Sequence, residues 1–216
     1  MIEKYTTKVQ FDKHGIKPIT TPLWFNAFEK LSIADTCITK MTDSRNQVEY
    51  NSAWNHFVDN IQLFWKELET EGKKHSGFNG WIGTYRSQRK KDKLLQYLLQ
   101  YRNQIHHGDI SLQWTAGRIE INSKDGFCGV ISKLTFNGSD EVGVEADSMG
   151  TGTKVNIRCK DGTPELPTVY NRDQTYPPPK THFKKTINSK DPKAIAVLAI
   201  NYYTDIYKKV IKKFSS

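Results

Sequence analysis

One short segment of the chain combines an arginine, an asparagine and two adjacent histidines, and it reads Arg102-Asn103-Gln104-Ile105-His106-His107. An arginine guanidinium binds a phosphate through two parallel hydrogen bonds, and it stabilises the charge that develops on a phosphodiester during its cleavage. A histidine has a pKa near neutrality, so it can move the proton. Neither step requires a metal ion. The segment therefore predicts chemistry at phosphorus, with Arg102 and His107 as the principal groups and Asn103 as a hydrogen-bonding partner.

A helix must carry this segment, and the segment must lie at the end of that helix. Leu94, Leu98, Tyr101 and Ile105 recur at helical spacing. Gly108 follows, and a glycine adopts the left-handed conformation that terminates a helix at little cost. We therefore expect a helix that ends near His107.

The pattern Arg-Asn-x-x-x-His, with its helical context from about Gln88 to Gly108, resembles the motif of the HEPN superfamily. The resemblance implies a compact helical bundle in which Arg102, Asn103 and His107 are the site residues. It also implies a homodimer in which two motifs meet and cut RNA without a metal or other cofactor. Attack by the ribose 2′-hydroxyl would leave a 2′,3′-cyclic phosphate and a 5′-hydroxyl. Many members of the superfamily are toxins or antiphage defence effectors, so an antitoxin or regulatory protein is a further expected partner.

The identity of the reactive histidine is open. On an ideal helix His106 lies about 40° from Arg102 around the axis, whereas His107 lies about 140° away. Helical geometry therefore favours His106, which stays as the alternative. The superfamily spacing favours His107, because the helix is expected to unwind at Gly108 and to free the last side chain.

Two simpler interpretations of the segment carry no catalysis. Arginine and histidine near a helix C-terminus stabilise the helix dipole and bond its last carbonyl groups. Adjacent histidines followed by Asp109 also suggest a metal, but neighbouring helical side chains point in different directions and no second ligand cluster is visible. We therefore expect no metal site. The remaining histidines lie in separate segments.

A basic run precedes the motif helix and is the predicted RNA-binding surface. It comprises Arg86, Arg89, Lys90, Lys91 and Lys93. Cations at the N-terminus of a helix oppose its dipole, so helix stability does not call for them there. Contact with an RNA backbone explains the run, and a solvated junction between two helices explains it equally simply.

The composition agrees with a basic, soluble, cytoplasmic protein. The chain has 216 residues, a formal net charge of +9 and 37% hydrophobic residues, and such an excess of positive charge often reflects a polyanionic partner. The sequence has no secretory signal pattern and no apolar run long enough to cross a membrane. Its three cysteines, which are odd in number and far apart, predict neither disulfides nor a zinc knuckle.

The hydrophobic pattern predicts a single domain, 1–216, of the α+β class and predominantly helical. Residues 1–109 hold the N-terminal helices: one from Thr21-Pro22 to about Met41, one from a capping box at Ser44 and Gln47 to Glu71, then a glycine-containing loop and the motif helix. An antiparallel β-rich insert is expected over 110–160, because the apolar residues alternate there. A proline-rich strap over 161–190 returns the chain to a final helix over 191–216, which is expected to dock on the bundle.

Two classes of function remain in competition. The first is a metal-independent endoribonuclease that works as a homodimer. The second is a non-catalytic HEPN-like module that binds RNA or a protein partner through the same arginine and charge. A purely structural helical dimer is a third interpretation.

Overall fold

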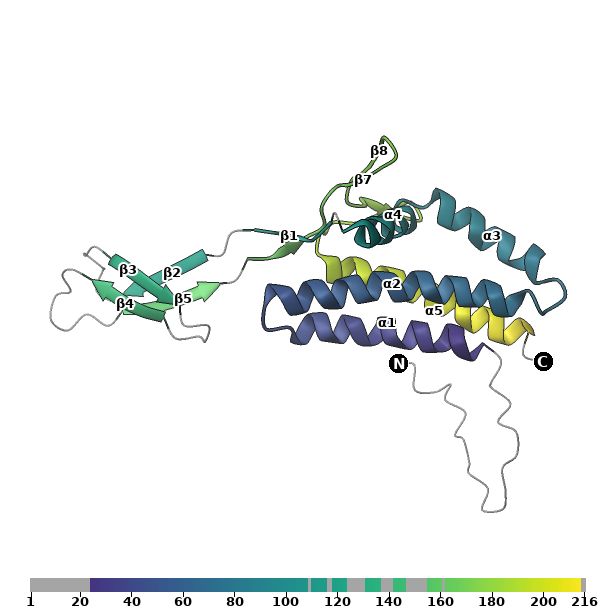
Figure 1. The fold of residues 1–216 in the computed structure, drawn as a ribbon, viewed down its shortest axis with the longest axis horizontal. Helices are drawn as coiled ribbons and strands as arrows, with labels where there is room; N and C mark the ends of the chain where they lie inside the picture. Colours follow the sequence, from purple (N-terminus) through teal and green to yellow (C-terminus); the bar gives the residue numbers. More distant parts are fainter. Residues whose placement is uncertain are drawn as a thin grey trace, which may run out of the picture. The chain divides into compact units, whose positions relative to one another are not determined.

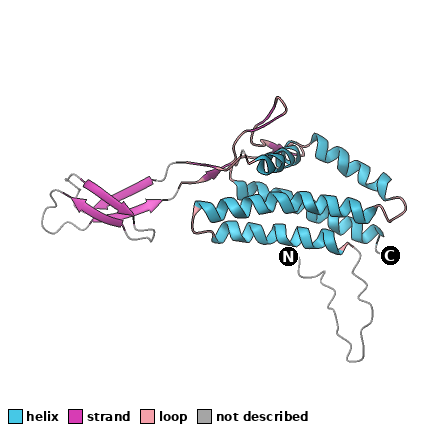
Figure 2. Ribbon diagram, viewed as in Figure 1, coloured by secondary structure: helices cyan, strands magenta, loops and turns pink. Residues whose placement is uncertain are grey.

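The computed structural model describes residues 24–108, 110–115, 118–123, 131–136, 142–146, 155–160 and 162–214, with the backbone alone for the strands between 118 and 160. It is an α+β protein that is predominantly helical (Figures 1 and 2). The chain divides into two compact units. Residues 1–112 and 166–216 form the helical unit, and Gln113–Glu165 form the other.

Helices α1 (Phe25–Asp43) and α2 (Gln47–Gly72) form a long antiparallel hairpin (Figure 1). Helix α1 begins at Phe25 and not at Pro22, and Thr21 and Pro22 lie outside the described residues. The cap of α1 comes from the far end of α2, where the Glu71 carboxylate accepts bonds from the backbone amides of Asn26 (3.2 Å) and Ala27 (3.4 Å). A tertiary contact therefore satisfies two free amides at the start of α1.

The predicted capping box of α2 is displaced by two residues. Asn46, not Ser44, is the N-cap: its side chain accepts from the Glu49 amide at 2.9 Å, and the Glu49 carboxylate accepts from the Arg45 amide at 2.9 Å. These bonds satisfy the amide of Glu49 in the first turn and the amide of Arg45 just before the N-cap. Ser44 instead donates to the Met41 carbonyl and so closes the end of α1.

The segment with Gly80 and Gly83, which we expected as a loop, is helix α3 (Phe78–Lys91). Aromatic packing outweighs the low helix propensity of the two glycines. Phe78 contacts Trp81 at 5.7 Å between ring centroids, and Trp81 contacts Tyr85 at 4.9 Å. A tight turn at Gly77 (φ 76°) separates α3 from α2.

The motif helix is α4 (Lys93–His107), and the last helix is α5 (Pro192–Phe214). Helix α5 begins as predicted, because the Asp191 carboxylate accepts from the Lys193 amide at 3.0 Å. It packs along α1 and α2, where Tyr203 meets Phe64 at 5.6 Å between ring centroids. The prediction that the last helix docks on the N-terminal helices is confirmed.

The core of the helical unit is rich in aromatic side chains. Trp54, Phe57, Phe64 and Leu68 of α2 are fully buried, so the stripe of large apolar residues along this helix is a packing surface. Cys37 is a buried free thiol within α1.

The segment predicted as a proline-rich strap contains two short hairpins. Strands β7 (Val169–Asn171) and β8 (Gln174–Tyr176) form the first, and β9 (Thr181–His182) and β10 (Lys185–Thr186) form the second. Both contact α4. The run Pro177-Pro178-Pro179 lies between the two hairpins.

The second unit consists of antiparallel strand pairs. Strand β2 (Arg118–Ser123) pairs with β5 (Val155–Lys160), β3 (Ile131–Phe136) with β4 (Val142–Ala146), and β1 (Gln113–Trp114) with β6 (Pro164–Glu165). The expectation of antiparallel strands over 110–160 is confirmed, because β1 to β5 all lie within this range. The sequence also predicts turns at Asp125-Gly126, Gly138-Ser139-Asp140 and Gly150-Thr151-Gly152, because these are turn-forming residues between the alternating segments. All three lie outside the described residues.

Candidate functional site

The predicted motif lies in the last two turns of α4. Gly108 follows in the left-handed conformation (φ 80°), and its amide bonds back to the Ile105 carbonyl at 3.1 Å. The helix end and the role of Gly108 are therefore as predicted. The helix is regular through His107, so the backbone leaves the helix after this residue and not before it.

Arg102 and His106 meet at a carboxylate of a neighbouring helix. The Nε of Arg102 lies 3.3 Å from Oδ1 of Asp59, and the Nε2 of His106 lies 2.9 Å from the same oxygen. Asp59 belongs to α2, which packs beside α4. Spacing by four residues places the arginine and the histidine on one face of α4, as the ideal helix predicts. The sequence offered no signal for Asp59, because its partners are more than forty residues away.

His107 and Asn103 do not take part in this junction. His107 is exposed, and in the described part of the chain its ring makes no hydrogen bond. Asn103 is half-buried and makes no hydrogen bond to Arg102. The terminal nitrogens Nη1 and Nη2 of Arg102 likewise have no partner among the described residues, so the arginine fork stays available.

All four motif side chains line one open cavity of about 610 Å³ beside α4. The hairpin β7–β8 forms its other wall and contributes Arg172, a residue that the sequence did not single out. The hairpin is attached to the motif helix by two side-chain bonds. Asn171 donates to Gln100 at 2.6 Å, and Gln104 donates to the Tyr170 carbonyl. The complete lining is Gln100, Arg102, Asn103, His106, His107, Asn171, Arg172, Gln174 and Tyr176.

The charged residues that line this cavity are basic. They are two arginines and two histidines, and no carboxylate of the described residues is among the lining residues. Asp59 contacts Arg102 and His106 but does not itself line the cavity. Such a cavity favours an anion, and arginine is the residue that best matches the geometry of a phosphate.

Arg172 occupies a strained position at the tip of the hairpin. Both turn residues have positive φ, 49° at Arg172 and 61° at Asp173, which is the conformation of a two-residue type I′ turn. Asparagine and glycine are favoured in such turns, and an ordinary residue there costs about 1 kcal/mol. The residues Asn171-Arg172-Asp173 do include turn formers, and this was the one signal that could have revealed the hairpin.

The basic run lies at different helix positions from those predicted. Arg89, Lys90 and Lys91 occupy the last turn of α3, where they complement the helix dipole, and only Lys93 begins α4. Their charge is therefore favourable for helix stability, contrary to the expectation from the sequence.

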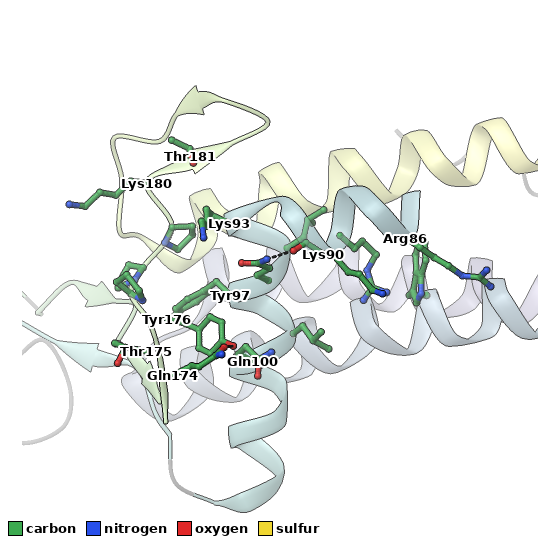
Figure 3. A pocket seen from close by; sticks show the side chains of 18 of the residues that line it. Arg86, Lys90, Lys93, Tyr97, Gln100, Gln174, Thr175, Tyr176, Lys180 and Thr181 are labelled. Carbon is green, nitrogen blue, oxygen red and sulfur yellow. Dashed lines mark hydrogen bonds between the residues drawn. The ribbon is translucent and has the colours of Figure 1, made fainter. Parts of the chain in front are cut away.

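Most residues of the basic run line a second open cavity of about 920 Å³ (Figure 3). Arg86, Arg89, Lys90 and Lys93 line it, whereas Lys91 lines a different hollow. Arg86 is paired with Glu69 at 2.7 Å. Arg89 stacks on Trp65 at 4.2 Å and bonds to Gln62 and Tyr203, so its guanidinium is part of the wall.

Asp92 fixes the beginning of the motif helix. Its buried carboxylate accepts from the backbone amides of Leu95 (3.1 Å) and Phe183 (2.7 Å) and contacts His182 Nδ1 at 3.0 Å. Burial by itself would raise the pKa of this carboxyl. The hydrogen bonds from His182 and the two amides outweigh burial and hold the pKa of Asp92 below its usual value. Asp92 therefore ties the hairpin β9–β10 to α4 while it caps the helix.

Comparison with known proteins finds no matching family model, no similar curated protein and no similar solved structure. None of the helices among the described residues is both long and apolar enough to cross a membrane. The described residues also contain no group of three or more histidine, cysteine or acidic side chains placed to hold a metal ion.

Proposed function

We propose that this protein is a metal-independent endoribonuclease of HEPN type that works as a homodimer. The observation that carries the proposal is the cavity at the end of α4, where Arg102 and His107 lie with Arg172 and without a lining carboxylate. A phosphodiester is the ligand that such a cavity fits best, because two guanidinium groups can hold its oxygens.

The reaction requires three tasks at one phosphate. The ribose 2′-hydroxyl loses a proton and attacks the phosphorus, the bond to the 5′-oxygen breaks, and that oxygen takes up a proton. His107 has an unoccupied ring in the cavity and would accept or deliver a proton. In the homodimer, the same histidine of a second copy would perform the opposite transfer. The free nitrogens of Arg102 would stabilise the charge on the phosphate.

The remaining motif residues would assist these groups. Asn103 would orient the phosphate through its amide, and Asp59 would hold Arg102 and His106 in place through the bonds of 3.3 and 2.9 Å. By this argument His106 is a positioning residue and His107 is the catalytic one.

The test is cleavage of mixed RNA by the purified protein in excess EDTA. We expect cleavage to persist in EDTA, and we expect products with 2′,3′-cyclic phosphate ends. Arg102→Lys keeps the charge but loses the fork, so RNA binding should decline far less than cleavage. Asn103→Ala should have an intermediate effect. A protein that binds RNA yet cuts no substrate, with or without metal ions, would refute the enzymatic proposal.

One observation favours the second candidate, a module that binds RNA or a protein partner without turnover. The Asp59 carboxylate lies 3.3 Å from Arg102 Nε, so a phosphate must compete with its negative charge for the guanidinium. Asp59→Asn separates the two candidates. In a binding module the substitution would only strengthen RNA binding, because a competing charge is removed. In the enzyme it would strengthen binding but slow the chemical step, because Arg102 and His106 lose their positioning.

A further inference from the structure

The cavity lined by the basic residues and the cavity lined by the motif are parts of one surface. Gln100, Gln174 and Tyr176 line both of them. Figure 3 shows these side chains close together, between α4 and the strand β8, with Lys90 and Arg86 further along the helices. A ligand that enters the larger cavity can therefore continue to Arg102 and His107 without leaving the protein surface. We call the two cavities together the basic groove.

The larger part of this groove carries a strong positive charge. Five cationic side chains line it against a single carboxylate, Glu69, which is already paired with Arg86. Lys90 and Lys93 are exposed, and neither has an ion-pair partner in the part of the chain that the structure describes. Two free ammonium groups beside one cavity favour a ligand with more than one phosphate.

Tyr176 lies where the two parts of the groove meet. Its backbone pairs with Val169 across the hairpin, and its hydroxyl donates to Gln174 at 2.5 Å. The prolines that follow it, Pro177-Pro178-Pro179, also line the groove and restrict the backbone. A half-exposed aromatic ring beside a basic surface is a platform on which a nucleic-acid base can stack.

We propose that the basic groove binds a single strand of RNA, with Lys90 and Lys93 on its phosphates and Tyr176 stacked on an unpaired base next to the cleaved bond. The inference rests on the proposed function, because it names the substrate class of the same site. Continuity of the two cavities supports a polymer over a single nucleotide. Stacking on Tyr176 requires a base that is free of a partner strand, since bases in a duplex are enclosed between their neighbours.

Binding is measured with a 2′-O-methyl RNA of about 12 nucleotides, labelled with a fluorophore, by fluorescence anisotropy in EDTA. This probe lacks the attacking hydroxyl, so binding is separated from cleavage. Lys90→Ala with Lys93→Ala removes two phosphate contacts, and each contact on a single strand contributes about 0.7 to the slope of log K against log salt. The slope should therefore fall by about 1.4, and at about 0.1 M salt the affinity should fall about 25-fold.

Lys208→Ala with Lys212→Ala is the matched control. Both residues are exposed on α5, neither lines the groove, and the net charge falls by the same amount. Affinity and salt slope should stay close to those of the wild-type protein. Equal losses in the two double variants would overturn the inference, because binding would then reflect net charge alone.

Tyr176→Ala tests the stacking platform. Loss of one stacked base should weaken binding at least about fivefold, and Tyr176→Phe should restore it because the ring remains. If Tyr176→Phe binds the RNA as weakly as Tyr176→Ala, the hydroxyl and not the ring contributes to binding, and the stacking arrangement is wrong. The proposal is also overturned if duplex RNA of equal length, or a free nucleotide, binds as tightly as the single strand.

Failure of this inference is distinguishable from failure of the proposed function. If the wild-type protein cleaves RNA and the groove variants cleave and bind normally, the enzyme stands and the groove assignment fails. If the wild-type protein binds single strands through Lys90, Lys93 and Tyr176 but never cleaves RNA, the groove stands and the enzymatic proposal fails.

Discussion

Asp92→Ala should destabilise the helical unit more than any surface substitution, because one carboxylate satisfies three groups at the start of the motif helix. Only 4% of the Asp92 side chain is exposed, and it accepts from Leu95 and Phe183 and contacts His182. Loss of an N-cap costs about 1 kcal/mol. An unsatisfied, partly buried amide costs about 1–3 kcal/mol. Together with the bond to His182, the expected loss in the free energy of unfolding is about 3 kcal/mol.

Thermal unfolding followed by circular dichroism measures this loss. For a chain of this size, each kcal/mol lowers Tm by about 2–4 °C, so Asp92→Ala should lower it by about 6–12 °C. Asp92→Asn keeps an oxygen for the two amides and should lose about half as much. Asp205→Ala, at an exposed site on α5, is the control and should leave Tm unchanged. A shift of less than about 2 °C for Asp92→Ala would refute the account of this site.

The same carboxylate predicts how stability depends on pH. Its pKa is lower in the folded protein than in the unfolded chain, so its contribution is complete above the unfolded value, about 3.9. The contribution is lost as the pH falls through the folded value. Acidification below about pH 4 should therefore destabilise the wild-type protein more steeply than Asp92→Asn. Parallel stability curves for the two proteins over that range would show that Asp92 is not the group responsible.

Two further predictions concern the motif and the aromatic core. His107→Ala should slow cleavage about a hundredfold or more with Tm unchanged, and His106→Ala should be milder; the opposite order in single-turnover rates would reverse the two roles. Gly72→Ala should destabilise the protein by about 1–3 kcal/mol, because the added Cβ would lie 2.2 Å from the ring of Phe78, which is fully buried. Gly80→Ala is the matched control, because the added Cβ meets nothing within 4 Å. The higher helix propensity of alanine should stabilise this variant by about 1 kcal/mol. Unfolding in urea measures both variants.

Local signals in the sequence determined the helix boundaries that depend on neighbouring residues. Gly108 ends α4 and Asp191 begins α5 as expected, because a left-handed glycine and an N-cap act within one turn of helix. The stripe of large apolar residues likewise identified α2, since its period reflects a single buried face. The order of helical and β-rich segments followed from the change of period after Ile110.

Contacts between distant residues determined the parts of the fold that local signals did not predict, namely helix α3 and the start of α1. Helix α3 forms despite Gly80 and Gly83 because its aromatic residues Phe78, Trp81 and Tyr85 are packed. Helix propensities describe single residues and do not include the free energy of this tertiary packing. The start of α1 depends on Glu71, which is 45 residues away from Asn26.

The candidate site likewise combines residues that the sequence indicated with residues that only tertiary packing brings to it. Arg102, Asn103, His106 and His107 are adjacent along one helix, so their spacing could be read directly from the sequence. Asp59 comes from α2, and Arg172 and Tyr176 come from a hairpin about 70 residues beyond the motif. Only the packing of α2 and β7–β8 against α4 brings these groups to one cavity, because a local pattern carries no information about which distant side chains share a surface.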